Sequence, residues 1–438
     1  MTTQAAPERP GTPPEVEPGP PSVPDRGPWL LRTARWLREA NPFVVTTLAI
    51  IVGLAFGAIL IMVTTPLLLH SWAGFFSHPW ATVRLNAITI WGAFELLFTG
   101  SIFDPRGVWT AIQHPSNANW TNALSPISST LTYATPLILA GLGLAITFRT
   151  SLFNIGGQGQ LIGGAILATY VGFTVNAPSI VLIPLEMLAA IIGGLLVASI
   201  VGILKAYTGA HEVIVTIMMN YVMGFLLAYL VLANGFKLPN ESEGESKRII
   251  VAGQLPRLFG FLSSTLQVNL GFIIALAAVV VVWWFLNRST TGFEFQMVGA
   301  NPEAARTAGV NARRVIVLAM CISGALVGLA GMVQVAGIDT YLTTPYGGTI
   351  GFDAIVIALL GRNTPFGVLG AALLFGALDS GGHQLQIYSS TNIDYSISLV
   401  IQAVIVFCVA TPALILGLFR LRQPTTAKAA LASSGWAK

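Results

Sequence analysis

Amide side chains are concentrated at one point of an otherwise apolar stretch of this 438-residue chain. Asn154, Gln158 and Gln160 alternate with glycines in the run FNIGGQGQ, residues 153–160. In hydrocarbon each amide must meet a partner or water, because an unpaired polar group is costly there. Two interpretations stay open. The amides line a polar path for a solute at a re-entrant turn, or they bond to neighbouring backbone and only pack.

Further polar groups lie within predicted membrane segments. The run HEVIVTIMMNYV carries Asn220 and Tyr221. Glu186 is an acidic residue in the first third of the apolar segment 179–206. Intramembrane acids are candidate sites by default. Glu212, Asp353 and Asp379 lie nearer to segment ends, where capping or snorkelling explains them. Our candidates for a translocation path are Asn154, Gln158, Gln160, Glu186, Asn220 and Tyr221.

A second motif lies in the polar, glycine-rich segment 288–314, between two strongly apolar segments. Asn301 can cap a short helix through its side-chain oxygen, Pro302 suits the first helical position, and Glu303 favours the positive end of the helix dipole. Ala304, Ala305 and Gly309 permit another protein to approach closely. The segment is therefore a predicted docking surface, and an ordinary amphipathic loop helix is the alternative.

Several kinds of chemistry lack their residues. No glycine is followed directly by lysine, so the phosphate-binding G-x-x-x-x-G-K-[ST] loop is absent from the chain. The five histidines show no spacing suited to a metal. We expect no metal, no cofactor and no enzymatic activity, and if ATP drives this protein another subunit must hydrolyse it.

The composition places these motifs in an integral membrane protein. Apolar residues make up 54% of the chain and charged residues 9%, against roughly 25% charged in a soluble domain. The sequence predicts an all-α protein with about ten transmembrane helices, each near the ~20 residues that cross a bilayer. The predicted spans are 43–65, 131–148, 159–174, 179–206, 212–235, 269–287, 315–338, 352–361, 366–381 and 396–419. The eighth is so short that it and the ninth could form a broken hairpin.

Charge predicts the orientation of these spans. With both termini in the cytoplasm, sixteen of the 22 Lys and Arg residues fall inside and six outside, as the positive-inside rule requires. The net charge of +4 is then a topology signal, and nothing suggests nucleic-acid binding.

The domain division follows from the same patterns. Residues 1–42 form a disordered, proline-rich cytoplasmic tail with a basic segment next to the membrane, since they cannot bury enough apolar surface to fold. Residues 43–419 form the transmembrane domain, and 420–438 a second cytoplasmic tail. Within the domain, 66–130 is an extracytoplasmic region with a possible interfacial or re-entrant helix at 87–98.

Four ordered motifs resemble one family of transporters. F-N-I-G-x-x-G-Q at 153–160, the run opening at residue 211, E-A-A-x-x-x-G at 303–309 and the run 351–378 resemble permeases of ABC importers of the ribose, branched-chain amino acid and nucleoside type. The similarity covers about residues 130–420. The I-x-L-P sequence typical of the other major importer class is absent after Gly309.

The resemblance implies a permease subunit in the bacterial cell membrane that moves a nucleoside or simple sugar. It implies that the 301–309 segment is a coupling helix, and that the partners are an ABC ATPase, a second homologous permease and an extracytoplasmic substrate-binding lipoprotein, within membrane lipid. A branched-chain amino acid permease is the alternative, and an ion-coupled secondary transporter is a further rival.

Overall fold

A computed structural model describes residues 42–239, 244–263, 265–388, 393–411 and 418–419. Within these residues the chain is helical, and strand pairing is limited to two isolated bridges. The elements are α2 (Pro42–Thr64), α3 (Pro66–Ala73), α4 (Pro79–Thr99), α5 (Pro105–Gln113), α6 (Asn117–Arg149), α7 (Gly157–Thr174), α8 (Ser179–Ile203), η1 (Leu204–Thr208), α9 (Glu212–Leu230), η2 (Val251–Gly253), α10 (Leu270–Arg288), α11 (Thr290–Ala300), α12 (Pro302–Thr307), α13 (Ala312–Gln334), η3 (Val335–Asp339), α14 (Ile350–Leu360), α15 (Pro365–Tyr388) and α16 (Ser396–Ala410). The all-α membrane fold predicted from composition is confirmed.

Seven of the described helices are long and apolar enough to cross a membrane, or eight if the pair α4 and α5, bent by 55°, counts as one span. The seven coincide with seven of the ten predicted spans. The other three correspond to α7, which carries two glutamines in its first turn, and to the short helices α14 and α16. The count of ten therefore stays a prediction, whereas the short eighth segment is confirmed as an 11-residue helix.

The region 66–130 contains α3, α4, α5 and the beginning of α6. Its apolar patch 87–98 lies within α4, and the bend between α4 and α5 makes the pair a broken span or a re-entrant segment. The predicted tails 1–42 and 420–438 lie outside the described residues except for Pro42.

At the centre of the molecule α7, α8 and α13 cross one another and make contact at glycine residues. A Cβ atom added to Gly328 of α13 would overlap the backbone of α8 at Ala190 and Gly194, and one added to Gly164 of α7 would overlap Gly328. Such small residues let helix backbones approach closely where lipid provides no hydrophobic force between helices.

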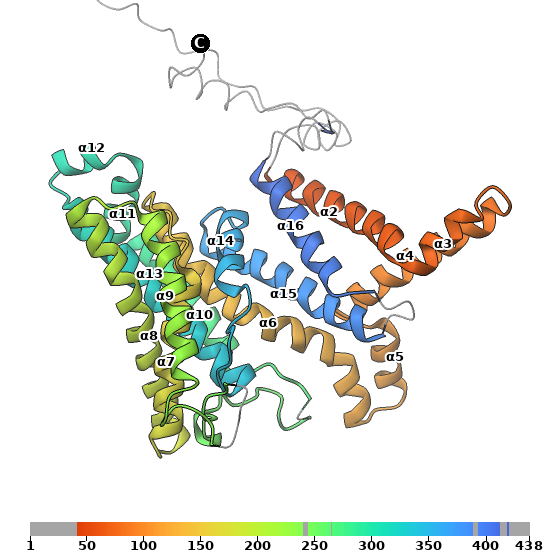
Figure 1. Cartoon of the computed structure of the whole chain (residues 1–438), viewed down its shortest axis with the longest axis horizontal. Coiled ribbons are helices and arrows are strands. Elements are labelled where there is room, and N and C mark those ends of the chain that lie inside the picture. Colours follow the sequence, from red (N-terminus) through yellow and green to blue (C-terminus); the bar gives the residue numbers. More distant parts are fainter. Residues whose placement is uncertain (1–41, 240–243, 264, 389–392, 412–417, 420–438) are drawn as a thin grey trace, which may run out of the picture.

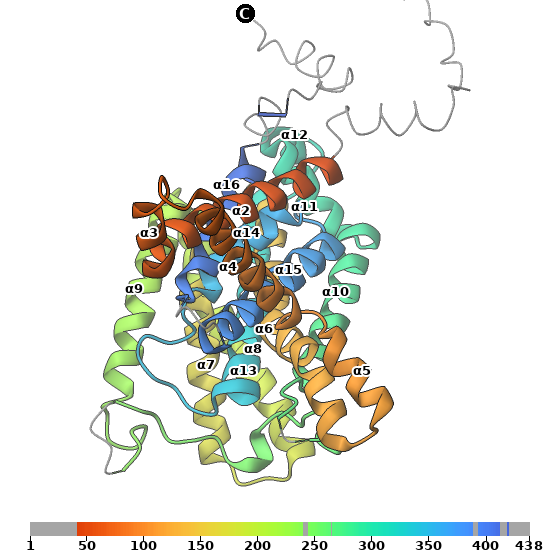
Figure 2. The ribbon, with the colours of Figure 1, turned by 90° about the vertical axis from the view of Figure 1, so that its right-hand side faces the viewer.

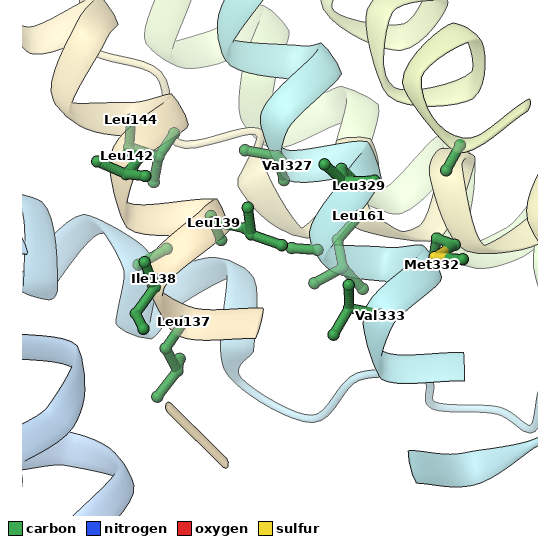
Figure 3. Close-up of a cluster of buried hydrophobic side chains, with 14 of the residues drawn as sticks. Leu137, Ile138, Leu139, Leu142, Leu144, Leu161, Val327, Leu329, Met332 and Val333 are labelled. Atoms are coloured by element: carbon green, nitrogen blue, oxygen red, sulfur yellow. The ribbon is translucent and has the colours of Figure 1, made fainter. Parts of the chain in front are cut away.

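Long α6 encloses this crossing from one side, packed against α13 and α15 (Figure 1). Its buried leucines and isoleucines face side chains from α7 and α13 (Figure 3). The labelled side chains are Leu137, Ile138, Leu139, Leu142, Leu144, Leu161, Val327, Leu329, Met332 and Val333. The result is one apolar core that spans the middle of the helix bundle.

Loops with predicted cytoplasmic positions gather at one end of the molecule, here called the α12 end. The Arg149 side chain after α6 donates a hydrogen bond of 2.8 Å to the carbonyl of Asn363 after α14. The Arg313 guanidinium at the start of α13 lies 5.8 Å from the centroid of the Tyr207 ring after α8. Figures 1 and 2 show α12 at this same end.

The other loops gather at the opposite end, here called the η2 end. The Ile250 N–H before η2 donates to the carbonyl of Gly172 near the end of α7, at 3.1 Å. The Ser246 N–H donates to Leu342 after η3, at 2.9 Å. Loops therefore alternate between two ends, as a protein crossing a membrane several times requires.

The beginning of α2 and the end of α16 lie together. Gly53 and Gly57 of α2 approach Ile405 and Ile401 of α16 respectively, so the two helices run antiparallel. Figures 1 and 2 place the start of α2 and the end of α16 toward the α12 end. This arrangement fits termini on one side, and their cytoplasmic location remains a prediction from charge.

We expect Gly328→Ala to lower the midpoint of thermal unfolding of the purified protein, because one extra methyl group in a packed core typically costs about 1–3 kcal/mol. Gly224→Ala in α9 is the matched control, since its added Cβ meets nothing within 4 Å. Equal midpoints for the two variants would contradict the close crossing.

Candidate functional site

The break between α6 and α7 is closed by an amide pair. Asn154 and Gln160 are fully buried. The Asn154 Nδ2 atom donates to Gln160 Oε1 at 3.2 Å and to Ser323 Oγ of α13 at 3.1 Å. Its Oδ1 atom accepts from the Gly156 N–H at 3.0 Å and from Gln160 Nε2 at 3.1 Å. These two amides satisfy each other and tie the break to α13.

Gln158 joins the first turn of α7 to the segment before α14. Its Nε2 atom donates to the Tyr346 carbonyl at 2.7 Å, and its Oε1 atom accepts from the Gly351 N–H at 2.9 Å. A Cβ atom on Gly351 would overlap Gln158, so the glycine permits this contact. The side chain is 8% exposed and holds the 346–351 backbone in place.

Asn220 makes the equivalent connection from α9. Its Oδ1 atom accepts from the Gly159 N–H at 2.8 Å, and its Nδ2 atom donates to the Ile155 carbonyl at 2.9 Å. The first N–H groups of a helix have no partner within that helix, and Gly156 caps α7 without a side chain. Asn220 supplies the missing acceptor.

A cavity of about 800 Å³ opens beside Gln158 and Asn220. This volume falls within the ~300–1,000 Å³ range of ligand pockets. Its walls come from the first turns of α7, one face of α9 and residues 344–352. The lining includes Gln158, Asn220 and Tyr221, together with the aromatic side chains of Phe225, Tyr346 and Phe352. Three of the six predicted path residues therefore meet at one cavity.

The other three candidates lie apart from the cavity lining. Asn154 and Gln160 form the buried pair described above. Glu186 lies in α8 toward the η2 end, fully buried, with Gly172 and Gly253 packed against its Oε1 atom. Among the described residues neither of its carboxylate oxygens has a hydrogen-bond partner. Its part in a path remains a prediction.

Sequence reasoning missed the segment 344–352, which forms one wall of the cavity. Its signal was the turn-forming run TTPYGG immediately before the short α14. Gly347 and Gly348 have positive φ angles of 71° and 48°, so the chain turns sharply there, as glycine allows. The glycine-rich turn before a short apolar helix is therefore the sequence signal that would have pointed to this cavity wall.

The predicted helix cap at Asn301 is confirmed. Its Oδ1 atom accepts from the N–H groups of Glu303 at 3.0 Å and Ala304 at 3.1 Å, and Pro302 is the first residue of α12. Glu303 and Ala304 are exposed, whereas Ala305 is buried against the core. The face available to a partner thus excludes Ala305.

Gly309 ends α12 in a left-handed conformation, with φ at 86°. The N–H groups of Gly309 and Val310 donate to the carbonyls of Arg306 and Ala305, both at 3.0 Å, which is a common helix C-terminal motif. Asn311 then caps α13 by accepting from the Arg314 N–H at 3.2 Å. Only four residues separate the two helices, so α12 is attached closely to α13.

Comparison with known proteins matches residues 126–410 to the family model of the branched-chain amino acid transport system permease component. The guanosine ABC transporter permease protein NupP of Bacillus subtilis is 38% identical over 290 residues, covering 66% of this chain and 82% of that protein. The glucose ABC transporter permease protein TsgB13 of Haloferax volcanii is 33% identical over 291 residues, covering 65% and 76%.

A second guanosine permease protein of Bacillus subtilis, NupQ, is 30% identical over 259 residues, covering 58% of this chain and 80% of that protein. No solved structure matches the chain.

We expect Asn154→Leu to lower the thermal unfolding midpoint and the yield of folded protein. The change removes the hydrogen bonds that Asn154 makes to the Gly156 N–H, Gln160 and Ser323. Each buried polar group left without a partner costs about 1–3 kcal/mol. Tyr221→Leu is the comparison, because this ring is 60% exposed and substitutions at exposed sites usually stay within about 0.5 kcal/mol. An equal loss of stability in both variants would contradict the separation of buried pair and cavity wall.

Proposed function

This chain belongs to the family of permease components of branched-chain amino acid type transport systems, and we propose that it forms the membrane path of an ATP-driven importer for a nucleoside or simple sugar. As a family member it is a multi-pass transport component of the cell membrane and not an enzyme. The observation that carries the proposal is the exposed helix α12, joined through four residues to α13, after which the chain continues through η3 to the segment 344–352 that lines the cavity. One chain thus connects a docking surface with a solute-sized space.

In this proposal the ATPase subunit acts on α12. This helix lies at one end of the helix bundle (Figures 1 and 2), and Glu303 and Ala304 are exposed there. An ATPase subunit that binds this surface moves α12, and α13 transmits the movement because glycines pack it closely against α8. The bundle then shifts between states that open the path to opposite sides. Asn301, Pro302, Glu303, Ala304 and Gly309 shape this docking surface, and Ala305 anchors it.

A second permease completes the path. One wall of the cavity is the face of α9 that carries Tyr221 and Phe225, which are 60% and 73% exposed. Such exposed aromatic side chains beside a polar cavity suit contact with another helix bundle. The two guanosine permease proteins of Bacillus subtilis support a pair of related subunits, and an extracytoplasmic binding lipoprotein would deliver the solute to the η2 end.

The cavity favours a neutral solute over an amino acid. None of the described side chains that line it is charged, whereas a zwitterionic amino acid brings a carboxylate and an ammonium group that are costly to desolvate without partners. Aromatic rings suit the faces of a base or sugar ring. The names of the guanosine and glucose permeases support the same choice.

An ion-coupled secondary transporter would place titratable groups at a central site. None of the described residues that line the cavity is acidic. The buried Glu186 lies apart from that lining, and Glu212 pairs with Lys205 at 2.7 Å at the start of α9. Uptake measured with ATP depleted and ion gradients intact separates the two mechanisms. Continued uptake would overturn the proposal of ATP-driven transport.

We expect Glu303→Lys to reduce the amount of ATPase that copurifies with the permease and to abolish uptake. The new lysine would face the basic ATPase surface that complements Glu303 in this proposal, and like charges placed opposite each other at an interface cost several kcal/mol. Glu245→Lys at the η2 end makes the same charge change away from α12 and serves as the control. Normal uptake with full ATPase retention in Glu303→Lys would show that α12 is only a connector.

The substrate proposal predicts a competition result in proteoliposomes that contain the purified complex and ATP. Uptake of labelled guanosine or of labelled glucose should fall when the same unlabelled compound is added and should not fall when leucine is added, since none of the described side chains that line the cavity is charged to pair with the leucine termini. Uptake of leucine in preference to both would instead assign the chain to amino acid transport.

A further inference from the structure

A second groove lies between α7 and α9 at the η2 end. Its volume is about 760 Å³, again within the ~300–1,000 Å³ range of ligand sites. Apolar side chains of both helices line most of it, including Leu167 and Leu230, and Lys247 of the following loop lies at its rim. The groove is therefore apolar along its length and cationic at one end.

Aromatic contacts hold this rim in place. Phe173 packs edge to face against Tyr170 at 5.6 Å and against Phe236 at 5.4 Å between ring centroids. The Lys247 Nζ atom lies 5.5 Å from the centroid of Phe173, and the Lys247 N–H donates to the Phe236 carbonyl at 2.8 Å. Backbone and side chain together fix the ammonium group above the apolar part.

This groove is distinct from the candidate path. Leu230 and Tyr221 are nine residues apart on α9, which places them about 180° apart around a helix of 3.6 residues per turn. Tyr221 lines the first cavity and Leu230 the groove. The described residues that line the two spaces do not overlap, so the groove is a separate space from the cavity.

The position of the groove indicates an amphipathic occupant. It surrounds the ends of α7 and α9, at Thr174 and Leu230, where spanning helices leave the hydrocarbon and reach the headgroup layer. Lys247 makes no ion pair with a described carboxylate. An ammonium group would be costly against an apolar helix of another subunit, whereas it complements a phosphate.

We propose that the groove binds one anionic phospholipid, with an acyl chain along Leu167 and Leu230 and the phosphate on Lys247. The lipid would pack against the end of α9, apart from the residues that line the solute cavity. Tyr170, which is 52% exposed, would cover part of the chain at the mouth of the groove. The proposal concerns lipid alone and does not depend on which solute the permease moves.

The test uses the purified full-length permease in detergent, with phosphatidylglycerol and phosphatidylcholine of identical acyl chains titrated separately. Native mass spectrometry measures the fraction of protein that retains each lipid. We expect phosphatidylglycerol to bind about fivefold more tightly, since a basic residue near the membrane surface contributes about 1 kcal/mol toward anionic lipid. Lys247→Gln should remove this preference, and Lys247→Arg should keep it.

Arg248→Gln is the matched control. It removes one positive charge from the neighbouring position, but Arg248 lies over the Tyr341 ring at 5.0 Å and does not line the groove. Ala233→Phe should fill the groove and weaken both lipids. The unfolding midpoint of each variant shows whether it is folded.

Four results would overturn the proposal. They are equal binding of the two lipids to the unmodified protein, an equal loss of preference in Lys247→Gln and Arg248→Gln, equally tight binding of glycerol phosphate without acyl chains, and unchanged lipid binding in Ala233→Phe. If Ala233→Phe separated the permease from its partner subunit while leaving lipid binding unchanged, the groove would be a subunit contact.

Discussion

The pairing of polar groups in a low-dielectric interior is the constraint on which the rest of this structure depends. The break between α6 and α7 releases N–H groups where hydrocarbon offers no acceptor. Asn154 and Asn220 supply acceptors there, and Gln158 in the first turn of α7 bonds to the backbone before and within α14. Because these bonds join the break to α13, to α9 and to the residues before α14, the same satisfaction of backbone groups also assembles the cavity walls.

Close helix contact is the second requirement, and α13 shows its mechanical consequence. Glycines bring α13 against α7 and α8 without intervening side chains. Its first residue follows the turn after α12, and its last turn widens into the π-helical η3, which ends with Thr340 in a left-handed conformation. In the proposed mechanism such a tightly packed helix would move as one body and carry a displacement at α12 to the segment that Gln158 holds. The proposed coupling surface and the proposed path would then be parts of one packing arrangement.

Helix α9 borders two separate spaces. One face lines a cavity whose described side chains are uncharged and include several aromatic rings, which suits neutral solutes and contact with a second permease. Its last residue, Leu230, borders a groove whose lining includes Lys247, which suits a lipid headgroup. Most of the surface of α9 is exposed in this chain and is available to lipid or to another subunit.

The sequence alone determined the features that depend on neighbouring residues. Apolar length located seven spanning helices, the Asn301-Pro302-Glu303 order located the cap of α12, and the short run before Gly361 located α14 as a half-length helix. Only the tertiary structure decided which amides face the cavity. Gln158 meets Tyr346 and Gly351 across 188 and 193 residues, and Asn154 meets Ser323 across 169. Such contacts depend on how helices cross, and the pattern of residue types along one helix does not specify its rotation relative to helices far away in the chain.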